Sequence, residues 1–216
     1  MSNIWISPKY TPAKLASGKI EDKIDVFKNK VIGWTFDHAD VLASNTDARG
    51  RHAGFAILML CSAYFEALHA CIEGRAASKR GESAKFFISG FLNVPALASV
   101  LPASLTQPQR EAVVYAIYRE VRCGLYHQLT VKTRVGITQN GAALRLKLDP
   151  STTEPLAIIL NPWALLTKLK AHFRTFVADL QNPANQSMRD TFELYFDGTR
   201  NNGPKIHFGT GAKSIS

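Results

Sequence analysis

The chain has 216 residues, of which 46% are hydrophobic and 20% are charged. These proportions are typical of a globular protein, and they exclude long intrinsic disorder and a collagen-like or low-complexity chain. Lys and Arg outnumber Asp and Glu by 26 to 17, which gives a net charge of +9. A surplus of this size favours an anionic partner, and nucleic acid is the first to consider.

The cysteines and the N-terminal sequence indicate a cytoplasmic protein. The three cysteines are an odd number without a C-x-x-C pair, so a reducing compartment is the simpler interpretation. Residues 1–18 lack the basic and apolar regions of a signal peptide. The most apolar stretch, 53–72, carries Ser62, Glu66 and His69, which a lipid-spanning helix should not leave unpaired. We therefore expect no membrane contact.

The first half of the chain predicts an irregular arm followed by helices. Residues 1–18 show no periodicity, whereas apolar residues recur near every 3.6 positions over 19–44 and predict a helix there. After a turn at 45–50, a second helix is expected over 51–73, ending at Gly74. It is apolar nearly all round, as a central buried helix should be. Its exception is a polar stripe, spaced four, three and four residues apart: Ser62, Glu66, His69 and Glu73.

The second half predicts more helices and a hairpin. A short helix is expected around 86–92, and a capping box at 106–109 opens a helix that reaches about residue 128. Alternating residues then predict strands over 131–138 and 142–148. The Asn140-Gly141 turn between them indicates an antiparallel hairpin, with 156–160 as a third strand. Asn161-Pro162 starts a helix to about residue 180, and a last helix covers 183–196.

These elements predict a mainly α fold with a small antiparallel β-hairpin. The expected parts are an irregular arm over 1–18, a helical core over 19–130, a hairpin with C-terminal helices packed on the same domain over 131–198, and a loose tail over 199–216.

The helix over 107–128 combines a core face with an unusual polar face. At 100° per residue, one side collects Val114, Ile117, Val121 and Leu125. The opposite side carries two neighbouring stripes, one formed by Tyr115, Arg119, Arg122 and Tyr126 and the other by Glu120, Cys123 and His127. Arg122 and His127 thus both point away from the core. Gly124 costs roughly 1 kcal/mol against Ala within a helix, which indicates that another backbone packs close to it.

Chance alone often places an Arg and a His five residues apart on a helix. Arg122 would then form an ion pair with Glu120 or Glu66, and His127 would be a solvated residue near the helix C-terminus. The two residues would have no joint role in this interpretation.

The segment YREVRCGLYHQ, residues 118–128, resembles the signature of HEPN domains, in which an Arg and a His are separated by four to six residues near the end of a long core helix. The helix order over 20–130 is similar as well. The resemblance implies a helical bundle that dimerises and brings Arg122 and His127 of both copies into one composite site. Many HEPN domains are metal-independent ribonucleases of toxin–antitoxin, phage-defence and CRISPR systems, and others are non-catalytic binding modules. Cys123 departs from the polar residue, often Asn, that follows the Arg in the family.

The residue types suit RNA cleavage. A histidine exchanges protons near neutral pH and can take the proton of the RNA 2′-OH, while an arginine offers a planar fork of donors to phosphate oxygens. Supporting roles are expected for Arg119 as a second phosphate contact, for Glu66 or Glu73 in orienting the Arg or His, and for Tyr126 in packing at the interface. The patch formed by Lys79, Arg80 and Lys85 would either follow an RNA backbone or form a solvated loop.

The sequence therefore predicts a homodimeric, metal-independent endoribonuclease that acts on single-stranded RNA and needs no cofactor. An antitoxin or another defence-system protein is a candidate partner. The alternatives are a non-catalytic HEPN module that binds RNA or protein, and an unrelated helical protein with a chance motif. Asp37, His38 and Asp40 form only a fragment of a metal-ligand set and are expected at a solvated helix end.

Overall fold

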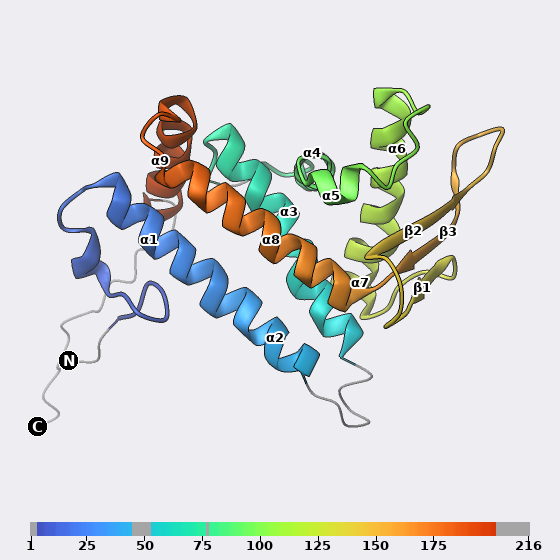
Figure 1. Cartoon of the computed structure of the whole chain (residues 1–216), viewed down its shortest axis with the longest axis horizontal. Coiled ribbons are helices and arrows are strands. Elements are labelled where there is room, and N and C mark those ends of the chain that lie inside the picture. Colours follow the sequence, from blue (N-terminus) through green and yellow to red (C-terminus); the bar gives the residue numbers. More distant parts are fainter. Residues whose placement is uncertain (1–3, 45–52, 77, 202–216) are drawn as a thin grey trace, which may run out of the picture.

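The computed structural model describes residues 4–44, 53–76 and 78–201 (Figure 1). Helices account for 64% and strands for 7%, so the prediction of a mainly α protein is confirmed. The helical elements are η1 (Pro12–Leu15), α1 (Ile20–Val31), η2 (Ile32–Phe36), α2 (Asp37–Ser44), α3 (Gly54–Glu73), α4 (Ser83–Leu92), α5 (Pro95–Ala98), α6 (Gln107–Ile117), η4 (Tyr118–Arg122), α7 (Cys123–Gln128), α8 (Pro162–Gln181) and α9 (Gln186–Asn201). The strands are β1 (Val135–Ile137), β2 (Leu144–Leu148) and β3 (Pro155–Leu160).

The first long helix runs from Ile20 to Ser44, as predicted, but it contains a π turn, η2, between α1 and α2. The arm before it is docked rather than loose. Ser7 is buried and donates a hydrogen bond of 2.8 Å to Asn29 Oδ1, and Pro8 packs against Gly33, where a Cβ would lie 2.3 Å from its Cγ. The predicted turn over 45–50 and the first residues of the second predicted helix lie outside the described residues.

The apolar helix α3 lies at the centre of the fold, packed by α4, α8 and α9 (Figure 1). The approach of α4 is very close, because a Cβ on Gly90 would meet the carbonyl oxygen of Phe65 at 1.9 Å. Cys61 and Cys71 are buried on α3 as free thiols, where they pack as small hydrophobic side chains. Burial raises the pKa of Cys61 to about 12.

Over the described residues, α3 is also the one helix whose length and composition would allow it to cross a membrane. Its most apolar window is 56% buried within the fold. A core helix of a folded domain has this property, because its apolar side chains are covered by neighbouring helices.

The sheet differs from the predicted hairpin. Its strand order is β1-β3-β2, with β3 parallel to β1 and antiparallel to β2, so the predicted pairing of 131–138 with 142–148 is wrong. The apolar strand β3 takes the central place, where both its edges are covered, and β2 reaches it through a turn organised by the carboxylate of Asp149. Gly141 still forms a turn with φ +85°, but that turn leads from β1 to β2 without pairing them.

The helix boundaries follow the predicted capping residues. Thr106 and Gln109 form the capping box at the start of α6. Asn161 caps α8 by accepting a hydrogen bond of 3.1 Å from the Ala164 N–H, and its amide donates to the carbonyl oxygens of Gln139 and Gly141. The last helix, α9, continues to Asn201, past the expected end at 196. Residues 202–216 of the predicted tail lie outside the described residues.

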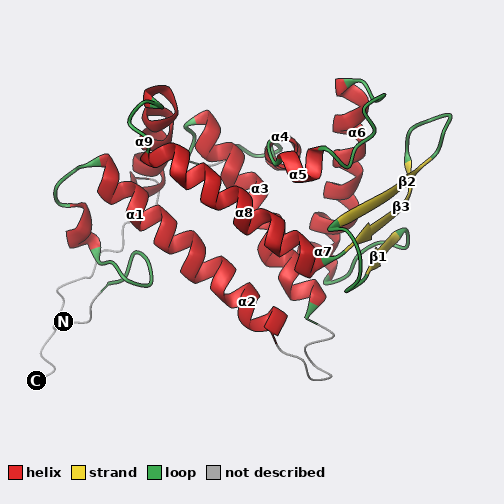
Figure 2. Ribbon diagram, in the orientation of Figure 1, coloured by secondary structure: helices red, strands yellow, loops and turns green. Residues whose placement is uncertain are grey.

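The two ends of the molecule carry different elements. Figure 2 shows the three strands at one end, beside α6 and α7, and α9 at the opposite end. The motif helix, which is formed by α6, η4 and α7 and carries Arg122 and His127, therefore lies between the helical core and the sheet.

Candidate functional site

The motif helix is built from three segments, α6, η4 and α7. The middle segment is a π turn, in which each residue advances less around the axis than the 100° of an α-helix. The predicted core residues Val114, Ile117, Val121 and Leu125 are all buried. The predicted place of Glu120 on an open polar stripe is wrong, because Glu120 lies within the π turn and only 4% of it is exposed.

Arg122 is held against α3 by Glu66. Its Nε donates a hydrogen bond of 2.7 Å to Glu66 Oε1, and both side chains are about one-fifth exposed. The guanidinium carbon lies 4.6 Å from the centre of the Tyr126 ring and 5.7 Å from that of Tyr118. Because Nε alone binds the carboxylate, the terminal nitrogens make no hydrogen bond within the described part of the chain. Of the two pairings open to Arg122, the structure selects Glu66.

Tyr126 fixes α7 to α3. Its hydroxyl donates a hydrogen bond of 3.0 Å to the carbonyl oxygen of Met59, while 40% of the residue stays exposed. The phenol ring thereby lies flat enough to support the Arg122 guanidinium. Tyr126 is thus a structural support of the arginine as well as a surface residue.

His127 lies on the last turn of α7 and is exposed. Within residues 4–44, 53–76 and 78–201, its ring has no hydrogen bond or ion pair. The helix ends at Leu129, which has a left-handed backbone with φ 53° and is 79% exposed. The predicted close backbone at Gly124 is the carbonyl of Thr130, 2.5 Å from where a Cβ would stand. It belongs to the chain's own turn after the helix.

Cys123 is half-buried beside Tyr118. Burial raises the pKa of Tyr118 to about 12, and the Cys123 side chain adds to the effect as a hydrogen-bonding neighbour. The residue after the motif arginine therefore contacts the ring on which Arg122 rests.

The side chain of Arg119 faces the sheet and does not face Arg122. It binds Glu120, which also accepts a hydrogen bond of 2.9 Å from Arg134. Burial alone would raise the pKa of Glu120, but the hydrogen bonds from Arg134 and Arg119 outweigh it and lower that pKa. Arg119 and Arg134 line a pocket of about 250 Å³ together with Tyr115. Arg134 is not predictable as a site residue from the sequence, because no motif links it to the helix.

Glu73 and the predicted basic patch lie elsewhere. Glu73 follows Glu66 by seven residues on α3, about 10 Å along the axis. Its carboxylate oxygens are 3.0 Å from His69 Nε2 and 3.6 Å from Lys85 Nζ. Lys79 and Arg80 are exposed in the adjoining loop. The predicted supporting residues therefore form two clusters, and Glu66 is the glutamate that contacts the motif arginine.

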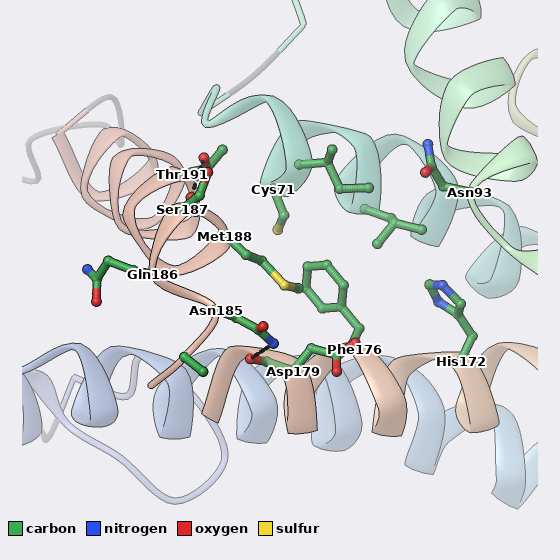
Figure 3. A pocket seen from close by; sticks show the side chains of 13 residues that line it. Cys71, Asn93, His172, Phe176, Asp179, Asn185, Gln186, Ser187, Met188 and Thr191 are labelled. Atoms are coloured by element: carbon green, nitrogen blue, oxygen red, sulfur yellow. Dashed lines mark hydrogen bonds between the residues drawn. The ribbon is translucent and has the colours of Figure 1, made fainter. Parts of the chain in front are cut away.

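A cavity of about 820 Å³ lies between α3, α8 and the start of α9 (Figure 3). None of its lining residues comes from α6, η4 or α7, and none is Lys or Arg. His172 projects into it from α8, and its Nδ1 lies 2.8 Å from the hydroxyl of buried Tyr64. Burial lowers the pKa of His172, although a bond to the backbone of Asn93 acts in the opposite direction. The periodicity of the sequence does not mark His172 as a candidate functional residue.

No family model, curated protein or solved structure matches this chain. Within the described residues, no three His, Cys, Asp or Glu side chains gather in a way that could hold a metal ion. The site is therefore defined by its own geometry. It consists of Arg122 bound by Glu66, exposed His127 five residues further along the motif helix, and aromatic rings around the arginine.

Proposed function

We propose that the protein is a metal-independent endoribonuclease of HEPN type that acts on single-stranded RNA in the cytoplasm. The observation that carries the proposal is the state of Arg122. Glu66 binds it through Nε, the rings of Tyr118 and Tyr126 support its plane, and its terminal nitrogens are left for a ligand. This is the geometry in which a guanidinium can bind a phosphate through two parallel hydrogen bonds.

The chemistry needs a second group, and His127 supplies it. The imidazole takes the proton of the 2′-OH, whose oxygen attacks the adjacent phosphorus as the bond to the 5′-oxygen breaks, and the leaving 5′-oxygen takes a proton from water. Arg122 stabilises the charge on the phosphate oxygens, and the products are a 2′,3′-cyclic phosphate and a 5′-OH. Glu66 acts as a positioning residue, because it contacts the arginine and not the RNA.

A homodimer completes the site. Arg122 and His127 lie about 140° apart around α7 on ideal α geometry, so one copy alone does not direct both at one phosphate. Exposed apolar residues flank His127 in the sequence, namely Tyr126 at 40% and Leu129 at 79%. A two-fold contact through this face would cover these residues and join the Arg of one copy to the His of the other.

One observation favours a second candidate, a non-catalytic HEPN module that binds RNA or a protein such as an antitoxin. Cys123 occupies the position after Arg122, and a thiol is a weak hydrogen-bond donor. In this candidate the braced arginine binds phosphate or a partner carboxylate without any bond being broken.

The deciding experiment incubates the purified protein with single-stranded RNA in EDTA. We expect cleavage that leaves a 2′,3′-cyclic phosphate, no cleavage of DNA, and a loss on the order of 10²–10⁴-fold for His127→Ala. Arg122→Lys should also be poor, since an ammonium lacks the planar fork. Cleavage that requires a divalent ion, or that survives His127→Ala, contradicts the mechanism. Sedimentation should show a dimer at tens of micromolar, and a strict monomer there would support the chance-motif alternative.

A further inference from the structure

Four side chains of the motif helix stack in one unbroken row. The rings of Tyr115 and Tyr118 are stacked with their centres 6.3 Å apart and 25° between their planes. Arg122 continues the row from Tyr118, and Tyr126 continues it from Arg122, at the distances given above. We call these four residues the tyrosine–arginine ladder. It extends across α6, η4 and α7, from the proposed reaction site to the side of the helix that faces the sheet.

The ladder is held at Arg122 and Tyr126 and is open at Tyr115. Glu66 binds Arg122, and the Met59 carbonyl binds the hydroxyl of Tyr126. Tyr115 at the outer end is 46% exposed, although it is a large aromatic residue. A pre-formed row of rings loses little conformational entropy when a flat ligand stacks on it.

Positive charge is concentrated in the part of the sequence that contains the ladder. Residues 110–147 contain seven Lys and Arg but two Asp and Glu, so five of the nine surplus positive charges fall in this stretch. Residues 148–201, by contrast, contain six acidic and five basic residues. Beside Tyr115, the pocket between α6 and the sheet is lined by the guanidinium groups of Arg119 and Arg134 and by the carboxylate of Glu154. Both arginines also bind buried Glu120.

We propose that the ladder and the Arg119–Arg134 pocket bind single-stranded RNA on the side of Arg122 where Tyr115 lies. The bases stack on the exposed rings, and the phosphates lie over the arginines. Aromatic rings that stack with bases, beside basic side chains that meet the phosphates, are the combination by which proteins hold single-stranded nucleic acid. The clustered charge favours this polyanion over a protein partner. The inference rests on the proposed function only in taking the strand to be the substrate of the Arg122–His127 site.

The test measures binding in a His127→Ala background, so that the RNA stays intact. Fluorescence anisotropy with a single-stranded RNA of roughly 12 nucleotides should show a Kd about tenfold weaker for Tyr115→Ala, because one stacked base is lost. Tyr115→Phe keeps the ring and should retain the affinity. Trp34→Ala removes a similarly exposed aromatic residue, 44% exposed on η2, and should leave the Kd unchanged.

The outcomes separate this inference from the proposed function. In the cleaving protein, Tyr115→Ala should raise KM for the longer RNA, and the effect should shrink as the RNA is shortened toward a dinucleotide. Tyr115-dependent binding without any cleavage by the wild type would contradict the proposed ribonuclease activity and support RNA binding by the ladder. Cleavage and binding that are both unchanged in Tyr115→Ala would overturn RNA binding by the ladder and support the proposed ribonuclease activity. Loss of the dimer in Tyr115→Ala with unchanged RNA affinity would also overturn it, because the rings would then serve a protein contact.

Discussion

At the scale of single residues, the arginine of the motif depends on one distant partner. Glu66 and Arg122 are 56 positions apart in the sequence, yet their side chains meet at 2.7 Å. The wheel geometry correctly placed both residues on polar stripes, and it also left Glu120 open as the partner of Arg122. The choice between the two glutamates needs the packing of α7 on α3, which no local pattern contains.

The Glu66–Arg122 pair should be measurable as a coupling energy. In a double-mutant cycle of Glu66→Ala and Arg122→Ala, unfolding in urea should give a coupling of about 1–2 kcal/mol, since a charged hydrogen bond that is largely shielded from water is lost. A parallel cycle of Lys14→Ala and Asp25→Ala, an ion pair that is 3.3 Å long and more exposed, should give less. A coupling near zero for the first pair would mean that the arginine is not braced in solution.

At the scale of elements, periodicity and capping residues predicted the helices well, and geometry that departs from the α-helix was not predictable. The capping box at Thr106 and the Asn161-Pro162 start both lie where expected, because each satisfies backbone groups locally. The π turns are hidden, since neither IGWTF in η2 nor YREVR in η4 contains a pattern that marks a π turn. The hairpin failed for a different reason. Local turn chemistry at Asn140-Gly141 was outweighed by β3, whose apolar residues take the central strand position.

The contact between α3 and α4 should be intolerant of a single methyl group. Gly90→Ala places a Cβ 1.9 Å from the Phe65 carbonyl oxygen, which belongs to rigid backbone. We expect a loss of about 3 kcal/mol in the free energy of unfolding. Gly136→Ala is the matched control, because its Cβ meets only the flexible end of Ile159, at 2.8 Å, and should cost less than about 1 kcal/mol. Equal stability of the two variants in thermal unfolding would contradict the close packing.

At the scale of the whole molecule, two histidines, buried His69 and half-buried His172, tie stability to pH. Burial lowers the pKa of His69 below 6.5, against the opposing effect of Glu73, and burial likewise lowers that of His172. The ring nitrogens of His69 lack hydrogen-bond partners within the described residues, and the contact with Glu73 lies outside hydrogen-bond geometry. Both histidines are therefore held neutral in the folded protein.

This arrangement predicts acid sensitivity. Between the lowered pKa of the folded state and the pKa of 6.5, the unfolded chain binds more protons than the folded chain. The contribution of the two histidines to the free energy of unfolding is therefore complete above about pH 6.5. It falls as the pH decreases, by at most about 1.4 kcal/mol per pH unit for each histidine. Urea unfolding between about pH 7.5 and 5, above the range of the carboxyl groups, measures the slope. His69→Leu should make it shallower, and an unchanged slope would exclude His69 as a contributor.

The π turns carry a consequence for the history of the chain. A turn closed by i→i+5 hydrogen bonds contains one more residue than the α turn it replaces. The segment Tyr118–Arg122 thus holds an extra residue between α6 and α7. A homologue without that residue would retain the core positions of α6 and the Arg–His spacing of α7, and its alignment with this chain would need a one-residue gap just before the arginine. The insertion and the motif are adjacent, so a gapless comparison would shift one half of the helix out of register with the other.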